Sequence, residues 1–224
     1  IHLFASAQNR IVFSKNRIGL YICFSPSHYK LAYDWFLPSV KDDFEIKVKI
    51  FPQECEDAAF MSAGWTKTTT RKVEYIISAI KDNWGSVIIY SDVDIIFLRA
   101  VKQDLIAKLQ GNDIAIQTDF PKYQACTGFF ACRCNSTTLE VWQKTLDIMI
   151  KNADISDQKA FNMALRDMQD VKIVYLPKEY AHGSMNKGVW YSGPDDVFVP
   201  ENAYLYHANY THGVQLKIEQ FIKI

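Results

Sequence analysis

Apolar residues along the chain fall into short runs that alternate between strand-like and helix-like spacing. Val87–Tyr90 is a run of four β-branched or aromatic residues, which predicts a strand buried on both faces. Ile18–Phe24 predicts another strand, and Phe44–Phe51 predicts a third with one solvated face, because apolar and charged residues alternate there. Ile1–Phe13 is apolar without a clear period and is assigned at most to an edge strand.

Helical spacing separates these runs. An apolar stripe over residues 73–80 predicts a long amphipathic helix, with the threonine hydroxyls of residues 66–70 as its cap. A shorter helix is expected over Tyr29–Phe36, ended by Pro38. Further strands are predicted at 95–97, 113–117, 127–132, 172–176 and 203–207, and further helices at 102–109, 136–152, from 156 onward and around 218–222.

This alternation of strands and helices predicts an α/β fold. We expect a Rossmann-like, mostly parallel central sheet with helices on its faces. The 224 residues are enough for one domain, and no shift in composition marks a second. Sheets of this kind bind their ligands beyond the carboxyl ends of the strands, so residues that follow strands are the first candidates for a functional site.

Charge and cysteine content exclude several classes of function. The 25 Lys and Arg residues balance the 25 Asp and Glu residues, so no basic field for nucleic acid or an anionic membrane is expected. No apolar run approaches the ~20 residues that span a bilayer, and no signal-peptide pattern is present. The five cysteines are an odd number, which favours reduced thiols and a cytoplasmic location. The chain does not open with Met, so a trimmed leader and a secretory-pathway lumen stay open.

The strongest chemical signal is a pair of carboxylates directly after the buried strand. Asp92 and Asp94 flank one apolar residue, and an apolar run resumes at once. Such triplets also occur as turn residues or helix caps. Here, however, apolar runs on both sides are unlike a solvated turn, and unpaired carboxylates near a core are costly. Hard oxygen ligands of this kind suit Mg²⁺ or Mn²⁺ held together with substrate phosphates.

Other polar residues also follow predicted strands. Asp119 and His207 each end a strand, so two carboxylates and a late histidine offer three ligands for Mn²⁺. Gly213 and Lys217 would add backbone access and a positive charge, both of which suit a diphosphate. Lys72 lies at the margin of the apolar helix stripe, from which its ammonium could reach the sheet edge or extend into solvent.

Five motifs in order give the chain a family resemblance. They are Arg71–Tyr75, Ile89–Arg99, Thr127–Phe130, Asp157-Gln158 with Phe161-Asn162, and His207–Tyr210 with Gly213. Together they resemble the GT-A nucleotide-diphospho-sugar glycosyltransferases, a group that includes plant cell-wall xylosyl- and arabinosyltransferase relatives. The resemblance covers most of the chain from about Trp65 onward, and Cys126 and Ala100 depart from residues common in the family.

The resemblance implies a role for each matching residue. Asp92 and Asp94 would be the metal-binding DxD, with Asp92 also touching the nucleotide ribose, and His207 would complete the metal site. The remaining donor contacts would be Ser25 near the base, Lys72, Gly213 and Lys217 near the diphosphate, and Asp119, Thr127 and Gly128 around the donor sugar. Asp157 and Gln158 would face the reacting carbon as the catalytic pair.

The implied activity is a metal-dependent transfer of a sugar from a nucleotide-diphospho-sugar to a hydroxyl of a glycan or glycoprotein. A UDP-sugar is favoured, a GDP-sugar is possible, and the Asp-Gln pair is typical of retention. Inversion would instead need a carboxylate base, for which Asp157 or Asp195 would serve. Residues of about 1–100 would bind the nucleotide and about 101–224 the acceptor. The alternatives are a sugar-nucleotide-forming nucleotidyltransferase, whose basic Gly-rich loop is missing after Phe24, and a non-catalytic carbohydrate-binding module.

Overall fold

A mixed sheet forms the centre of the protein, as seen in a computed structural model that describes residues 17–55, 60–120, 124–168 and 170–224. In this part of the chain the sheet has six strands in the order β2-β1-β3-β6-β5-β7. Their bounds are β1 Gly19–Phe24, β2 Glu45–Ile50, β3 Val87–Ser91, β5 Ile114–Asp119, β6 Gln124–Arg133 and β7 Ile173–Tyr175. Only β6 runs antiparallel to its neighbours, so the predicted α/β class with a mostly parallel sheet is confirmed. The predicted edge strand Ile1–Phe13 lies outside the described residues.

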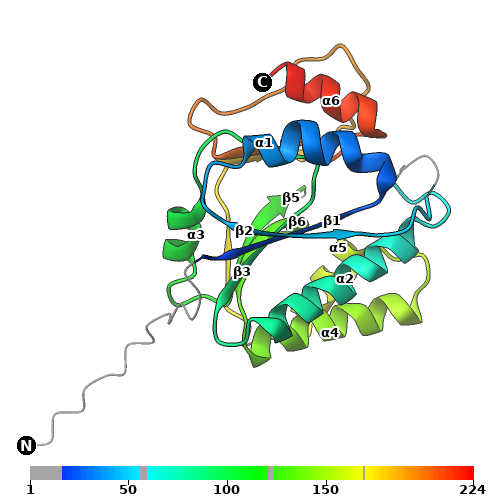
Figure 1. Ribbon diagram of the computed structural model, residues 1–224. Helices are drawn as coiled ribbons and strands as arrows, with labels where there is room; N and C mark the ends of the chain where they lie inside the picture. Colours follow the sequence, from blue (N-terminus) through cyan, green and yellow to red (C-terminus); the bar gives the residue numbers. More distant parts are fainter. Residues whose placement is uncertain (1–16, 56–59, 121–123, 169) are drawn as a thin grey trace, which may run out of the picture.

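The central strands are buried on both faces, as the apolar runs predict. Side chains alternate across a strand, so Val87 and Ile89 of β3 enter one apolar layer while Ile88 and Tyr90 enter the other. In Figure 1, α2 (Trp65–Asp82), α4 (Ser136–Lys151) and α5 (Asp157–Arg166) cover one face of the sheet. The other face carries a π-helical turn (Leu31–Phe36), α1 (Leu37–Ser39) and α6 (Val214–Ile222), with α3 (Lys102–Lys108) at the side.

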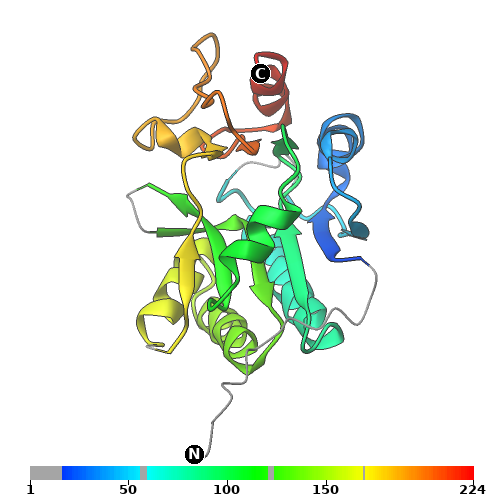
Figure 2. The same ribbon diagram turned by 90° about the vertical axis from the view of Figure 1, so that its left-hand side faces the viewer.

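A second, small sheet brings the C-terminal part of the chain to the end of β3. Its described strands are β4 (Ile95–Phe97), β9 (Leu205–His207) and β8 (Tyr180–His182), in the order β4-β9-β8. β4 and β9 are antiparallel, and their register sets Ile95 opposite His207. Figure 2 shows the C-terminal segment, orange to red, gathered with α6 at one end of the molecule. β8 is not among the strands predicted from the sequence.

Two predicted helix boundaries are wrong. α2 begins at Trp65 and has Gly64, with φ +82°, as its N-cap. The hydroxyls of Thr68 and Thr70 lie inside the helix, where they donate to backbone carbonyls one turn earlier, and so they cap nothing. Pro38 does not stop the preceding helix, which continues to Ser39. Pro38 directly follows the π-helical turn Leu31–Phe36 and is the second residue of α1.

The predicted burial of β2 also needs correction. Its apolar residues do alternate with charged ones, but they form no buried face: Ile46, Val48 and Ile50 are 39%, 41% and 42% exposed. The reason is position, because β2 lies at the edge of the central sheet. The alternation of apolar and polar residues in a strand is therefore visible in its sequence. Whether one face of the strand is buried depends on packing by segments far away in the chain.

The cysteines and helices agree with two further expectations. All five cysteines lie within the described residues, and each is free and buried, which confirms the prediction of unpaired thiols. In the ranges that the structure describes, none of the helices has both the length and the apolar character needed to cross a bilayer.

Candidate active site

A cleft of about 420 Å³ opens where β1, β3 and β5 end. Because β6 runs the opposite way, it contributes Thr127 and Gly128 from its first half. The cleft is lined by nearly all the residues that the sequence singles out, namely Ser25, Lys72, Asp92, Asp94, Asp119, Thr127, Gly128, Asp157, Gln158, His207 and Lys217. Gly213, the N-cap of α6, is not among the lining residues. Asp195 lines a separate small pocket and is not placed to act in this cleft.

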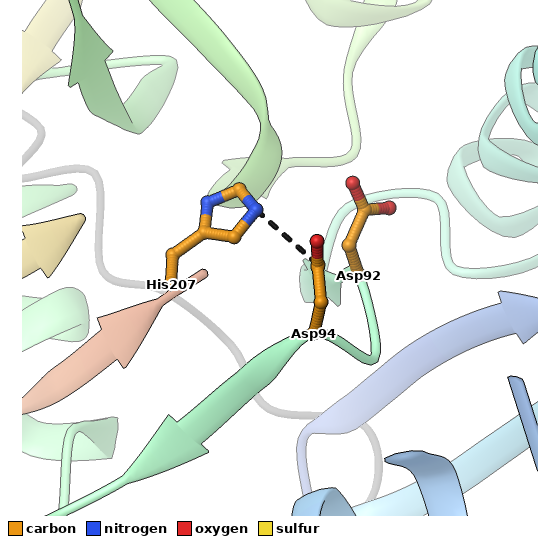
Figure 3. A group of neighbouring side chains, drawn as sticks. All are labelled: Asp92, Asp94 and His207. Carbon is orange, nitrogen blue, oxygen red and sulfur yellow. Dashed lines mark ion pairs between the residues drawn. The ribbon is translucent and has the colours of Figure 1, made fainter. Parts of the chain in front are cut away.

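Three possible cation ligands converge in the cleft. Asp92 and Asp94 lie in the turn between β3 and β4, and His207 ends β9 (Figure 3). One ligand atom from each lies within 4.8 Å of the others. Backbone hydrogen bonds fix the turn: Asp92 N–H donates to Gly128 O at 2.7 Å, and Ala208 N–H donates to Asp94 O at 2.9 Å. The pairing of β4 with β9 thus joins residues more than a hundred positions apart into one group.

Asp94 is surrounded by positive charge. Lys217 Nζ contacts Asp94 Oδ2, and His207 Nε2 lies 3.3 Å from Oδ1. Burial alone would raise the pKa of the Asp94 carboxyl, but Lys217 and His207 outweigh it and hold the pKa well below its usual range. Burial would likewise lower the pKa of His207, yet Asp94 raises it to about 10. Asp94 is therefore ionised, and a proton on His207 Nε2 lies where a cation would bind.

Lys72 is buried between two carboxylates. Its Nζ lies 3.0 Å from Asp92 Oδ1 and 3.0 Å from Asp157 Oδ2. Tyr90 Oη also donates to Asp92 Oδ1, at 2.9 Å. Burial lowers the pKa of Lys72, but Asp157 and Asp92 outweigh it and raise the pKa above its ordinary value. The ammonium thus reaches the sheet edge rather than solvent, and it carries a permanent positive charge into the cleft.

The first turn of α5 presents two polar side chains to the cleft. Ser156 caps the helix by accepting a hydrogen bond from Lys159 N–H at 3.1 Å, so Asp157 is not needed as the cap. Asp157 Oδ2 instead accepts a hydrogen bond from Thr127 Oγ1 at 2.9 Å. Gln158 Nε2 donates to Asp119 Oδ2. The two residues are therefore held by partners on β5 and β6.

Gly128 leaves room for the group of ligands. A Cβ atom at this position would lie 2.4 Å from His207 Cε1 and 3.0 Å from Asp92 Oδ2. The first distance is shorter than real van der Waals contacts allow and the second is a tight contact, so any side chain here would displace the imidazole. The absence of a side chain at Gly128 is thus a requirement of this geometry.

The donor set and the charge balance both suit a divalent cation. Two carboxylates and an imidazole are ligands that Mn²⁺ accepts. Among the described residues, buried Asp94 Oδ1 accepts no hydrogen bond, which is unusual for an ionised oxygen. The ammonium groups of Lys72 and Lys217 and the protonated imidazole of His207 together balance the carboxylates of Asp92, Asp94 and Asp157. A divalent cation in place of the Nε2 proton of His207 would make this group net positive, which favours binding of a diphosphate.

Several cleft residues were not identified from the sequence. Tyr90 had a usable signal, because it precedes Asp92 by two positions and side chains two apart share a face of a strand. Gln117 does not line the cleft but contacts His207, and it is indistinguishable in sequence from other polar residues of β5. Trp190 also lines the cleft, but it comes from an irregular segment without a period.

Comparisons with solved structures identify the fold. A glycosyltransferase involved in glycosylation of the major capsid of PBCV-1 matches with a TM-score of 0.62 at 11% identity, over 92% of this chain and 99% of that one. GlyE of Streptococcus pneumoniae TIGR4 matches with a TM-score of 0.58 at 10% identity, over 93% of this chain. The chain spans only 60% of the length of GlyE. The galactosyltransferase LgtC, in complex with donor and acceptor sugar analogues, matches with a TM-score of 0.54 at 11% identity, over 86% and 87% of the two chains.

The mixed α/β architecture and these matches define the class: the protein has the GT-A glycosyltransferase fold. No curated protein sequence matches this one. The family model for nucleotide-diphospho-sugar transferases, however, matches residues 43–221. The chain belongs to this nucleotide-diphospho-sugar transferase family, which confirms the family predicted from the five motifs.

Proposed function

We propose that this protein transfers a sugar from a nucleotide-diphospho-sugar to a hydroxyl of a glycan or glycoprotein, with Mn²⁺ or Mg²⁺ bound by Asp92, Asp94 and His207. A UDP-sugar is the favoured donor and a GDP-sugar the second choice. The observation that carries the proposal is the convergence of these three ligands, within 4.8 Å of one another, in a cleft that also holds two lysines.

The lysines would act on the leaving group. Breaking the bond between sugar and diphosphate develops negative charge on the diphosphate, and a bound divalent cation would supply Lewis-acid stabilisation there. Lys72 and Lys217 already contact the proposed ligands Asp92 and Asp94, so each ammonium lies beside the position that the diphosphate would take. Ser25, at the end of β1, would lie near the base, and Asp92 would also contact the ribose.

Asp157 and Gln158 would face the reacting sugar, together with Asp119, Thr127 and Gly128. Asp157 Oδ2 contacts Lys72 at 3.0 Å and Thr127 Oγ1 at 2.9 Å, so the carboxylate is anchored through one oxygen. We assign Asp157 to holding the sugar or acceptor. We assign Gln158 to stabilising the reacting face, and we expect transfer with retention.

The two halves of the chain would bind different substrates within one domain. Residues of about 1–100 supply the groups proposed to bind the nucleotide, and residues of about 101–224 those proposed to bind the acceptor. The cation site itself joins the halves, because His207 and Lys217 contact Asp94. We propose that neither half forms the site alone.

An aromatic wall supports a carbohydrate acceptor. Phe60, Trp65, Trp190 and Tyr210 all line the cleft. Trp190 stacks on His212 with ring centroids 4.2 Å apart, lies 5.2 Å from Tyr210, and is still 37% exposed. One face of the indole is thus covered by the imidazole, which leaves the remaining exposed area for a ligand. Flat apolar surfaces of this kind suit the C–H face of a sugar ring better than a charged diphosphate.

Trp190→Ala is therefore expected to raise the KM for a glycan acceptor by about 3–10-fold, because the variant loses one aromatic contact with the sugar. The KM for the donor should stay within twofold, and so should donor hydrolysis without acceptor. Steady-state kinetics with each substrate varied in turn measures this split. Trp84→Ala is the matched control, because Trp84 is 58% exposed and does not line the cleft. An unchanged KM for the acceptor would show that Trp190 does not contribute to acceptor binding.

A thermal-shift panel tests the proposed function as a whole. UDP, GDP, CMP and their sugars are each added with and without Mn²⁺. A ligand at 100 times its Kd stabilises by about 2.7 kcal/mol, or about 5–10 °C in Tm for a chain of this size. We expect this shift for UDP or its sugar with Mn²⁺ only. A shift with a nucleoside triphosphate plus a sugar 1-phosphate would favour a nucleotidyltransferase, and a shift with glycan alone a carbohydrate-binding module.

A further inference from the structure

Gln117 connects the central sheet to the small sheet next to the proposed cation site. Gln117 is fully buried. It lies on β5, where the pairing with β6 shifts register between Ile116 and Gln117. Such an irregularity redirects the side chains of a strand. Here the Gln117 side chain reaches β8 and β9, where it contacts two backbone carbonyls and one imidazole.

The orientation of the Gln117 amide is forced by its partners. Nε2 donates to Tyr180 O at 3.0 Å and to Ala181 O at 3.1 Å, which uses both of its hydrogens. A flipped amide would turn a carbonyl oxygen toward two other carbonyl oxygens, and all three can only accept. Oε1 must therefore point the other way, toward His207.

This orientation also determines which nitrogen of His207 carries hydrogen. Gln117 Oε1 lies 2.8 Å from His207 Nδ1, and an amide oxygen can only accept, so Nδ1 is the donor. The thiol of Cys126 lies farther from the same nitrogen, at 3.9 Å. In the neutral ring, the lone pair then belongs to Nε2, the nitrogen that lies 3.3 Å from Asp94 Oδ1.

We infer that Gln117 is a positioning residue that fixes the ring orientation and tautomer of His207, so that Nε2 is directed at the cation. The inference rests on the proposed cation site and adds a residue to it. Hydrogen bonds to the far nitrogen of a metal-binding histidine are worth about 10–100-fold in metal affinity. A purely structural Gln117 would instead only join β5 to β8, and its loss would lower stability without a specific effect on the cation.

Two substitutions at this position separate the two roles. Gln117→Leu removes both the acceptor for His207 and the donor to β8. Gln117→Glu keeps an acceptor for Nδ1–H at the same reach but loses the donor to the two carbonyls. We expect Gln117→Leu to weaken Mn²⁺ binding about 10–100-fold. Gln117→Glu should bind Mn²⁺ within about threefold of the wild type, although both variants lose thermal stability in EDTA.

The measurement is the Kd for Mn²⁺ alone, from the electron paramagnetic resonance signal of free Mn²⁺, with Tm in EDTA recorded beside it. Tyr206→Phe is the control, because it removes a buried hydrogen bond of 2.6 Å to Gln220 from the neighbouring residue of β9. Its Tm should fall while its Kd stays unchanged. If Gln117→Leu does not fold, Gln117→Met takes its place, because it also lacks an acceptor for His207 Nδ1–H but has a longer and more flexible side chain. The inference predicts the same loss of Mn²⁺ affinity for this variant, whereas a structural role predicts a lower Tm with an unchanged Kd.

A double-mutant cycle with His207→Ala completes the test. If Gln117 acts through His207, Gln117→Leu costs no further Mn²⁺ affinity in the His207→Ala background. An equal loss in both backgrounds, a wild-type Kd in Gln117→Leu, or a Kd for Gln117→Glu as weak as that for Gln117→Leu would each overturn the inference alone. A wild-type protein that binds no Mn²⁺ would overturn the cation site and this inference with it.

Discussion

Asp94→Asn is expected to lower kcat by on the order of 10²–10³-fold, the range that follows removal of one preorganised group that stabilises developing charge. The substitution keeps the shape of the side chain but removes the charge that Lys217 and His207 contact. It also offers a cation one weak amide oxygen in place of a carboxylate. Mn²⁺ affinity should fall together with turnover, and excess Mn²⁺ should restore part of the rate. Initial rates across a Mn²⁺ titration measure both effects.

The control for this variant is Asp154→Asn. Asp154 is exposed between α4 and α5 and does not line the cleft, so the same change of charge there should leave kcat and the Mn²⁺ requirement intact. Turnover by Asp94→Asn at the wild-type rate in metal-depleted buffer would refute the proposed role of the carboxylate pair.

Lys72→Met is expected to lower the free energy of unfolding by about 3–5 kcal/mol, since removal of one partner leaves buried charges uncompensated. The ammonium is 10% exposed and lies 3.0 Å from both Asp92 and Asp157. Methionine fills a similar volume, so most of the loss would come from two carboxylates without their cation. Urea unfolding in EDTA measures the change, which corresponds to about 6–20 °C in Tm for a chain of this size.

Lys67→Met makes the same substitution five residues earlier on the same helix. Its ammonium is 61% exposed and pairs with Glu54 at 2.9 Å, so its loss should cost less than about 1 kcal/mol. Mn²⁺ should recover part of the stability of Lys72→Met, because it would compensate the Asp92 carboxylate. Equal effects of the two substitutions would mean that the buried contacts of Lys72 are energetically unimportant.

Much of the fold and part of the site follow from local sequence patterns. The run Val87–Tyr90 predicts the buried strand β3, and the two carboxylates after it stand out because an apolar context makes them costly. For Lys72, at the edge of an apolar stripe, the sequence leaves two directions open, toward the sheet edge or into solvent, and the structure shows the first. In each case the signal lies within one turn or one strand of the residue concerned.

The remaining parts depend on contacts that no local pattern records. β8 is not predicted, and the pairing of Ile95 with His207 joins segments more than a hundred positions apart. Gln117 acquires its partners only because β8 and β9 lie next to β5. The antiparallel direction of β6 is equally hidden, because side-chain alternation is the same in both directions. Long-range register is therefore what the sequence alone leaves undetermined here.

The close approach of Gly128 to His207 also has a use for classifying other sequences. Because a single added carbon would lie 2.4 Å from the imidazole, a homologous chain with alanine or serine at this position must have moved its histidine or recruited a different ligand. The residue aligned with Gly128 can thus sort homologous sequences by whether they could form the proposed cation site in the same way, before any of them is expressed.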